Sequence, residues 1–188
     1  MSLLKDESFN QAVLVVARYS ADMQIKENTS TLKSFGVKKI ITGCPHCFHT
    51  LKNEYPDFDY KAEVVHHTEF IKQLIENKKI TLKDTDKESQ SITYHDSCYL
   101  GRHNNIYDAP RTILAETTKD TREMPRSKNK GFCCGAGGGL WWKKETQGKT
   151  HLVRAQQVVD ADVDTVVTGC NFCFGMMNFV TVLLGLVL

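Results

Sequence analysis

The sequence lacks an apolar run long enough to cross a membrane. Its two most apolar stretches, 12–17 and 179–188, are far shorter than the roughly 20 residues that a membrane-spanning helix needs. The first stretch is also too short for a secretory signal, and Lys5, Asp6 and Glu7 form the wrong flank for one. We therefore expect a cytoplasmic protein, with 179–188 as a core or interface helix or as the start of a membrane segment.

Charge of one sign is not concentrated anywhere either. Lys and Arg number 24 against 22 Asp and Glu, which gives a net charge of +2, and the charges are scattered. A nucleic-acid-binding protein should carry a concentrated basic face, so no nucleic-acid partner is expected. With 41% apolar and 24% charged residues in a chain of 188, the composition excludes disordered and collagen-like classes.

Cysteine, in contrast, is abundant. The seven cysteines are Cys44, Cys47, Cys98, Cys133, Cys134, Cys170 and Cys173. In a reducing compartment, cysteines at such tight spacings are typical of metal ligands or redox groups rather than of structural disulfides. The function of the chain is therefore expected to depend on these side chains.

One segment of the sequence occurs twice. Residues 37–48 read VKKIITGCPHCF, and residues 163–174 read VDTVVTGCNFCF. Each copy has a short β-branched run, then Thr-Gly, then two cysteines separated by two residues. This order indicates a buried strand, a glycine turn and the start of a helix. Both cysteine pairs should then lie at the carboxyl end of a strand, where open α/β sheets bind their ligands.

The remaining pattern predicts an α/β fold of two similar lobes, each with a short parallel sheet flanked by helices. The polar stretch 83–91 is interpreted as a linker between lobes at 1–82 and 92–188. Helices are expected at 8–35, 68–77, 110–116 and 148–160, strands at 62–65 and 92–94, and a glycine loop at 135–139. Asn28, Thr29 and Ser30 are candidates for a break in the first helix.

The second lobe alone holds five cysteines. Cys98 is followed after 34 residues by Cys133 and Cys134, and after 35 more by Cys170 and Cys173. Five thiolates exceed the four that a tetrahedral zinc ion needs, whereas an iron-sulfur cluster offers several metal atoms to adjacent cysteines. An iron-sulfur cluster is therefore the better fit.

The glycine loop supports that interpretation. It begins at Gly135, directly after the adjacent cysteines, and it includes Gly137. Backbone N–H groups in such a loop can approach cluster sulfides and thiolates closely, and hydrogen bonds of this kind raise a reduction potential. The stretch GAGGG lacks the GxGxxG spacing of a dinucleotide loop.

Two other functions stay open at this point. The first is a structural zinc protein, with zinc held by Cys44 and Cys47 or by the five-cysteine set. The second is a dithiol-disulfide oxidoreductase that uses Cys44 and Cys47, because proline and histidine between two cysteines at a helix start lower a thiol pKa.

These motifs resemble a known family, the cysteine-rich (CCG) domain of heterodisulfide-reductase-type iron-sulfur oxidoreductases. The resemblance covers about 31–177 and includes YHDSCYLGRHN at 94–104 and CCGAGGG at 133–139. The strings CPHCFHTLKNEYPDF at 44–58 and VVHHTEF at 64–70 are similar to the branch that passes electrons between electron-transfer flavoprotein and the quinone pool.

The resemblance implies a cofactor and partners. The cofactor would be a non-cubane [4Fe-4S] cluster bound by Cys98, Cys133, Cys134, Cys170 and Cys173. The function implied is electron relay between a flavoprotein-type or iron-sulfur donor subunit and a quinone or disulfide acceptor. A membrane-associated quinone-reducing partner would place the protein at the inner face of the plasma membrane.

The first copy of the repeat departs from the family pattern. It contains only Cys44 and Cys47, because the position that corresponds to the adjacent cysteines falls at Ser8, beside Glu7. The chain is therefore expected to be the C-terminal portion of a longer protein, or to carry a degenerate copy. Cys44 and Cys47 would then form a partial second metal site.

Two polar residues precede Cys98. His95 and Asp96 are candidates for a hydrogen bond to a thiolate or for proton delivery at the site. The alternative for His95 is a strand-end histidine that hydrogen-bonds to the backbone.

Overall fold

The computed structural model describes residues 7–81, 88–137 and 149–184. Its internal contacts divide the chain into two compact units. The first contains 1–40 and 50–64, and the second contains 41–49 and 65–188. The predicted lobe boundaries at 82 and 92 stay a prediction.

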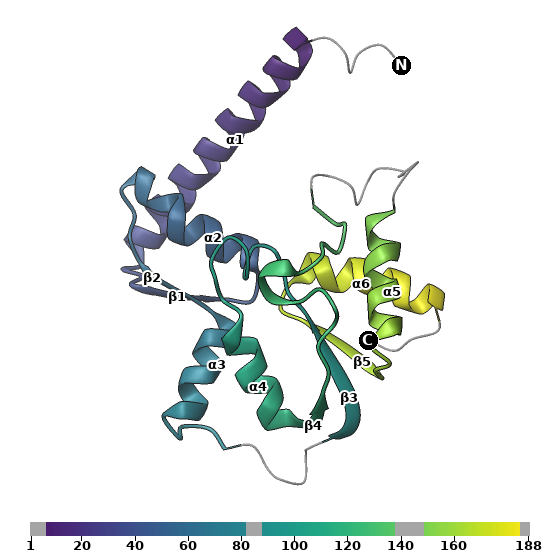
Figure 1. Ribbon diagram of the computed structural model, residues 1–188. Coiled ribbons are helices and arrows are strands. Elements are labelled where there is room, and N and C mark those ends of the chain that lie inside the picture. The colour runs from purple at the N-terminus through teal and green to yellow at the C-terminus, as the bar shows by residue number, and fades with distance from the viewer. Residues whose placement is uncertain (1–6, 82–87, 138–148, 185–188) are drawn as a thin grey trace. The chain divides into compact units, whose positions relative to one another are not determined.

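The first unit is built on the long helix α1 (Glu7–Ser34), followed by the 3-10 helix η2 (Tyr55–Phe58) (Figure 1). The expected break at 28–30 is wrong, because the helix continues through these residues. The Asn28 side chain donates to the Tyr55 hydroxyl at 3.1 Å instead of competing for the helix backbone. Gly36, with φ of +61°, then ends the helix.

The first copy of the repeat forms a strand and a helix, as predicted. Strand β1 (Lys39–Thr42) pairs with β2 (Glu63–His66) in a two-stranded sheet. Helix α2 (Pro45–Asn53) follows β1, and α3 (His67–Glu76) follows β2. The Nδ1 atom of His66 accepts from the backbone N–H of Thr68 and so caps α3.

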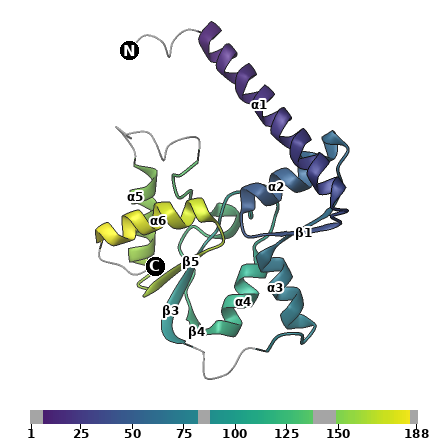
Figure 2. The ribbon, with the colours of Figure 1, turned by 180° about the vertical axis from the view of Figure 1, so that it is seen from behind.

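The second unit contains a parallel three-stranded sheet in the order β4 (Thr118–Thr121), β3 (Glu88–His95), β5 (Thr165–Thr168). Its helices are α4 (Asp108–Thr117), α5 (Thr150–Asp160) and α6 (Asn171–Leu184). The two views in Figures 1 and 2 show α3 and α4 together beside β4, and α5 and α6 together beside β5. The predicted α/β class with parallel strands and flanking helices is confirmed.

The sheet contains residues that the sequence pattern did not assign to strands. Strand β3 begins at Glu88, so it includes part of the predicted linker 83–91, and 83–87 lie outside the described residues. Strand β4 reads TKDT, and these residues are polar on both faces, so the sequence does not predict a strand here. Gly138 and Gly139 of the glycine loop and 185–188 of the apolar tail also lie outside the described residues.

The core of the second unit has two clusters of buried side chains. The smaller consists of Ile92, Tyr94 and Leu114, between β3 and α4. The larger contains Met124, Cys134, Ala136, Val158, Val163, Val166, Cys170, Cys173, Met176 and Met177. Three cysteines are therefore part of the wall of the main core.

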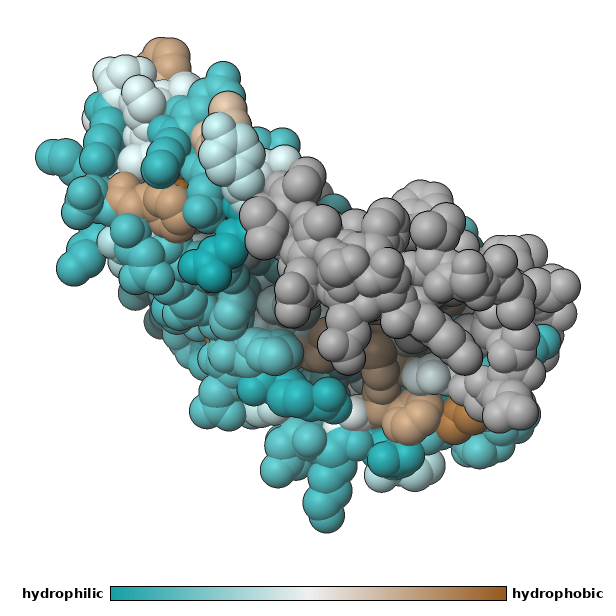
Figure 3. Space-filling model, turned by 90° about the horizontal axis from the view of Figure 1, so that it is seen from above, coloured by the Kyte–Doolittle hydropathy of each residue, from teal (hydrophilic) through white to brown (hydrophobic). Residues whose placement is uncertain are grey.

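The surface of the described residues is mostly hydrophilic on the face that Figure 3 shows, with apolar side chains in small patches. Helix α6 carries part of the apolar tail that begins at residue 179. Among the helices described, none combines the length and the apolar character that crossing a bilayer requires.

Replacement of Leu114 by alanine tests the smaller core cluster. Leu114 is 7% exposed and packs in the cluster with Ile92 and Tyr94, so the cavity should lower the free energy of unfolding by about 2 to 5 kcal/mol. The matched control is Leu152→Ala, whose side chain is 39% exposed and should change it by about 0.5 kcal/mol. Urea unfolding followed by circular dichroism measures both, and equal effects would contradict the packing described.

Candidate metal centre

The two copies of the repeat build the same local structure. Strands β1 and β5 each end at a threonine two residues before a cysteine, and α2 and α6 each begin one residue after it. The backbone N–H of Phe48 donates to the carbonyl of Cys44 at 2.9 Å, and that of Phe174 donates to Cys170 at 2.8 Å. Cys44 and Cys170 thus lie at strand ends, as predicted.

The pairing of β3 with β5 brings two cysteine segments to one edge of the sheet. The last residues of the two strands, His95 and Thr168, are register partners. The hydroxyl group of Ser97, two residues after β3, lies 3.4 Å from that of Thr168 at the end of β5. Cys98 and Cys170 follow directly, so they enter the same region from neighbouring strands.

Five thiols from three segments form one hydrogen-bonded group, which we call the five-cysteine site. Side-chain interactions link Cys133 with Cys98 and Cys134, and Cys173 with Cys134 and Cys170. All seven cysteines of the chain are free thiols. The structure therefore brings together the five cysteines of the predicted ligand set.

The interactions within the site shift the pKa values of its thiols in opposite directions. Those from Cys134 and Cys98 hold the pKa of Cys133 far below its usual range, and the one from Cys173 lowers the pKa of Cys170 to about 6. The hydrogen bond to Cys133 and burial raise the pKa of Cys98. The bonds to Cys134 and Cys170 raise the pKa of Cys173. Thiolate is the form of cysteine that binds metals.

Backbone N–H groups also point at the sulfur atoms. The N–H of Gly135 donates to the Cys133 Sγ at 3.3 Å. Gly135 has φ of +88°, and a Cβ there would lie 3.1 Å from the backbone nitrogen of His151, so glycine is required. At Gly137 a Cβ would meet nothing within 4 Å. Cys170 accepts from the backbone of Phe172 and Cys173 at the start of α6.

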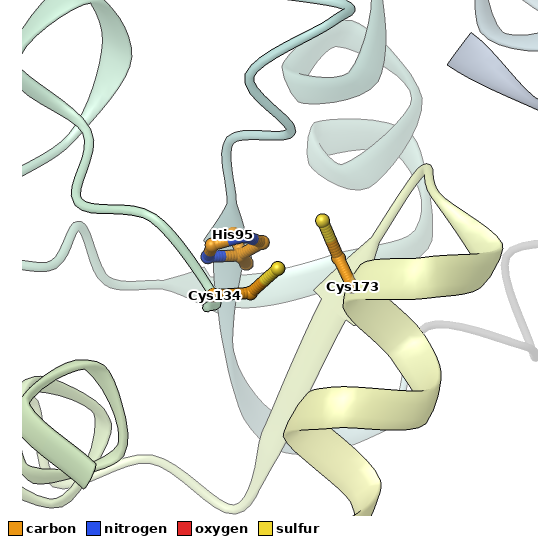
Figure 4. A group of neighbouring side chains, drawn as sticks. All are labelled: His95, Cys134 and Cys173. Carbon is orange, nitrogen blue, oxygen red and sulfur yellow. The ribbon is translucent and has the colours of Figure 1, made fainter. Parts of the chain in front are cut away.

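His95 lies against the five-cysteine site. Figure 4 shows its ring at the end of β3, beside Cys134 on a loop and Cys173 on α6. One ligand atom from each of these three residues lies within 4.8 Å of the others. Burial, and then the positive charge of Arg154, lower the pKa of His95 to about 3, so its ring is neutral. The hydrogen bond that the structure gives its ring is with Arg154, and a role toward the thiolates stays a prediction.

Asp96 faces a different partner. Its two carboxylate oxygens each accept from Arg111 at 2.9 Å, and one also accepts from the backbone N–H of Lys128 at 2.6 Å. Arg111 in turn donates to Glu123 at 2.9 Å and to the carbonyl of Tyr107 at 2.9 Å. Asp96 therefore anchors the segment that leads to Cys133.

Cys44 and Cys47 form a separate pair. Cys44 is half-buried and Cys47 is exposed, and partial burial followed by the hydrogen bond with Cys44 raises the pKa of Cys47. Between them, His46 places its Nδ1 3.9 Å from the Cys170 Sγ. Among the described residues, no third Cys, His, Asp or Glu places a ligand atom with this pair in one metal-sized group.

One residue beside the site, Arg154, belongs to none of the motifs identified in the sequence. Arg154 on α5 is 0% exposed and donates from Nε to the Nδ1 of His95 at 3.0 Å. Arginine is almost never fully buried unless it is paired. The only available signal is its spacing of four residues from buried Val158, which places both on the inner face of α5.

The fold and the site define a cysteine-rich α/β protein with a soft, thiolate-rich centre at the carboxyl edge of a parallel sheet. Its sequence matches the family model for the cysteine-rich domain, CCG, over residues 12–52 and 92–178. The chain belongs to this family, and the family prediction is confirmed.

Its relatives include named oxidoreductases. The chain is 43% identical over 155 residues to the probable iron-sulfur-binding oxidoreductase FadF of Bacillus subtilis. It is 38% identical over 161 residues to the EtfAB:quinone oxidoreductase of Syntrophomonas wolfei. It is 37% identical over 155 residues to one subunit of the dihydromethanophenazine:CoB-CoM heterodisulfide reductase of Methanosarcina mazei.

These alignments cover most of the chain but a minor part of each relative. They include 81%, 81% and 79% of this chain, and 22%, 22% and 37% of the three relatives in the same order. No solved structure matches the chain.

Replacement of Asp96 by asparagine tests the anchor before Cys133. The Asp96 side chain is 3% exposed, so loss of its charge beside Arg111 should lower the free energy of unfolding by about 3 kcal/mol. The same change at exposed Asp120, which pairs with Arg122, should have an effect below about 1 kcal/mol. Urea unfolding of both variants is the measurement, and an Asp96 variant as stable as the Asp120 variant would disprove the anchor.

Proposed function

We propose that this chain is an electron-transferring part of an iron-sulfur oxidoreductase, and that its five-cysteine site holds a non-cubane [4Fe-4S] cluster. The observation that carries the proposal is the convergence of five thiols: Cys98, Cys133, Cys134 and Cys173 line one cavity, and Cys170 interacts with Cys173. When bound, such a cluster supplies one-electron acceptance and donation.

The donor set fits this cofactor. Soft thiolates select iron-sulfur clusters or zinc, and five of them exceed the needs of one tetrahedral zinc ion. Cys133 and Cys134 are adjacent and would bind different metal atoms, which requires a cofactor with several. The N–H of Gly135 already donates to sulfur, and such bonds stabilise the more negative, reduced form.

The electron donor we propose is a flavoprotein or iron-sulfur subunit, and the acceptor is a quinone or a disulfide. The proposal draws on two relatives, one named an EtfAB:quinone oxidoreductase and the other a component of a heterodisulfide reductase. A further relative is named a probable membrane-anchored ferredoxin, which supports a place beside a membrane, and we propose a cytoplasmic location at the inner face of the plasma membrane.

A cavity beside the site could admit the acceptor. It has a volume of about 390 Å³ and reaches Cys170 at the start of α6. Its other lining residues are Gly43, His67, Thr168, Gly169, Asn171 and Phe174. The glycines before both cysteine pairs line this space, so an acceptor there would lie against a proposed cluster ligand.

A second candidate function rests on the Cys44 and Cys47 pair. Their hydrogen bond and the exposure of Cys47 would suit dithiol-disulfide exchange. Zinc at this pair would lack two of its usual four protein ligands in the described part of the chain.

Cysteine substitutions separate the two candidate functions. The protein purified without oxygen should contain about four irons and four sulfides per chain and be brown. Cys133→Ser should remove most of both, because Cys133 interacts with both Cys98 and Cys134. The matched control is Cys47→Ser, which should keep the parent's iron and sulfide.

Iron and sulfide analysis with EPR spectroscopy makes these measurements. A protein with zinc and without acid-labile sulfide would overturn the cluster. Disulfide exchange that survives Cys133→Ser and is lost with Cys47→Ser would instead favour the dithiol function.

Blocking the cavity tests the path to the acceptor. Asn171→Trp should fill space beside Cys170 and slow reoxidation of the reduced protein by a short-chain quinone or a small disulfide. We expect a decrease of about tenfold, which corresponds to about 1.4 kcal/mol in the barrier. Exposed Val153→Trp is the control. Stopped-flow absorbance follows the reaction, and equal rates for the two variants would exclude this cavity.

A further inference from the structure

Arg154 holds a fully buried cation beneath the five-cysteine site. Its Nη1 donates to the carbonyl of Arg126 at 2.8 Å and to the Gln157 Oε1 at 2.7 Å, and its Nε donates to His95. Each of these three partners of the guanidinium is electrically neutral. The cation is thus held in place by good hydrogen bonds without a carboxylate.

Arg154 has no ion-pair partner among the described residues. Its Nη2 also has no hydrogen-bond partner among them. Burial lowers its pKa to about 10, while Asp96, Cys134 and Cys173 favour its charged form. A buried cation without an ion-pair partner is energetically unfavourable. An anionic occupant of the thiol site would relieve that penalty.

Arg154 also determines the tautomer of His95, that is, which ring nitrogen carries the hydrogen. The guanidinium has no lone pair to accept a hydrogen bond, so the Nδ1 of His95 must be the acceptor. A neutral imidazole with a bare Nδ1 carries its hydrogen on Nε2. That leaves the Nε2–H available as a donor, and one ring nitrogen of His95 lies within 4.8 Å of the sulfur atoms of Cys134 and Cys173.

We propose that Arg154 is a positioning residue that raises the reduction potential of the cluster. It acts by its buried positive charge and by holding His95 as an N–H donor toward the thiolates. Both effects stabilise the more negative, reduced form of a cluster. This inference rests on the proposed function, because it requires a cluster in the five-cysteine site.

Redox titration of the purified protein, followed by EPR, tests the proposal. Arg154→Gln removes the charge and keeps a polar side chain, and it should decrease the equilibrium constant for one-electron reduction at least tenfold. Tenfold corresponds to about 59 mV. Arg154→Lys keeps the charge and should restore more than half of that shift. Arg122→Gln, which removes an exposed arginine, should leave the potential unchanged.

Iron and sulfide content distinguishes a failure of the proposed function from a failure of the role proposed for Arg154. A parent protein without a cluster would overturn the proposed function and this inference together. An Arg154→Gln variant that holds the parent's iron and sulfide, and also its potential, would overturn this inference alone.

A second measurement applies if Arg154→Gln does not fold. Pulsed EPR of the reduced parent protein, labelled with 15N in histidine, should show weak coupling to a histidine nitrogen and to an exchangeable proton. The signal should vanish in His95→Gln and persist in His46→Gln, since His46 is the other histidine near a site sulfur. A parent spectrum without the coupling, or loss of it only in His46→Gln, would contradict the role of His95.

Discussion

The parallel pairing of β3 with β5 is the constraint on which the rest of the site depends. Because His95 and Thr168 are register partners, the segments that carry Cys98 and Cys170 leave the sheet at the same edge. A shift of this register by one residue would turn alternate side chains to the opposite face of the sheet. The meeting of the cysteine segments, and the approach of His95 to Cys173, depend on this register.

The parts of the structure that could be predicted from the sequence are those with local patterns. The repeated Thr-Gly-Cys turn identified a strand and a helix around Cys44 and around Cys170, and both are present. The spacing of the cysteines identified five thiols that the structure brings together. In these cases a short run of residues determines both the backbone and the position of the sulfur atoms.

The parts that could not be predicted depend on contacts between distant residues. Strand β4 has a polar sequence and owes its place to pairing with β3. Nothing adjacent to Arg111 in the sequence points to Asp96, and nothing adjacent to Arg154 points to His95. The expected break in α1 failed for the same reason, since the partner of Asn28 is Tyr55. Single-sequence patterns carry no information on such pairs.

Because the five-cysteine site is built from three separate segments, the sheet must form before the ligand set is complete. Cys98, the adjacent Cys133 and Cys134, and the pair on α6 meet only after long stretches of chain have closed and β3 has paired with β5. A newly made chain therefore has no complete ligand set to offer until its sheet has formed. Any metal bound at this site would therefore be acquired after the strands have paired, and a delay in strand pairing would delay its binding.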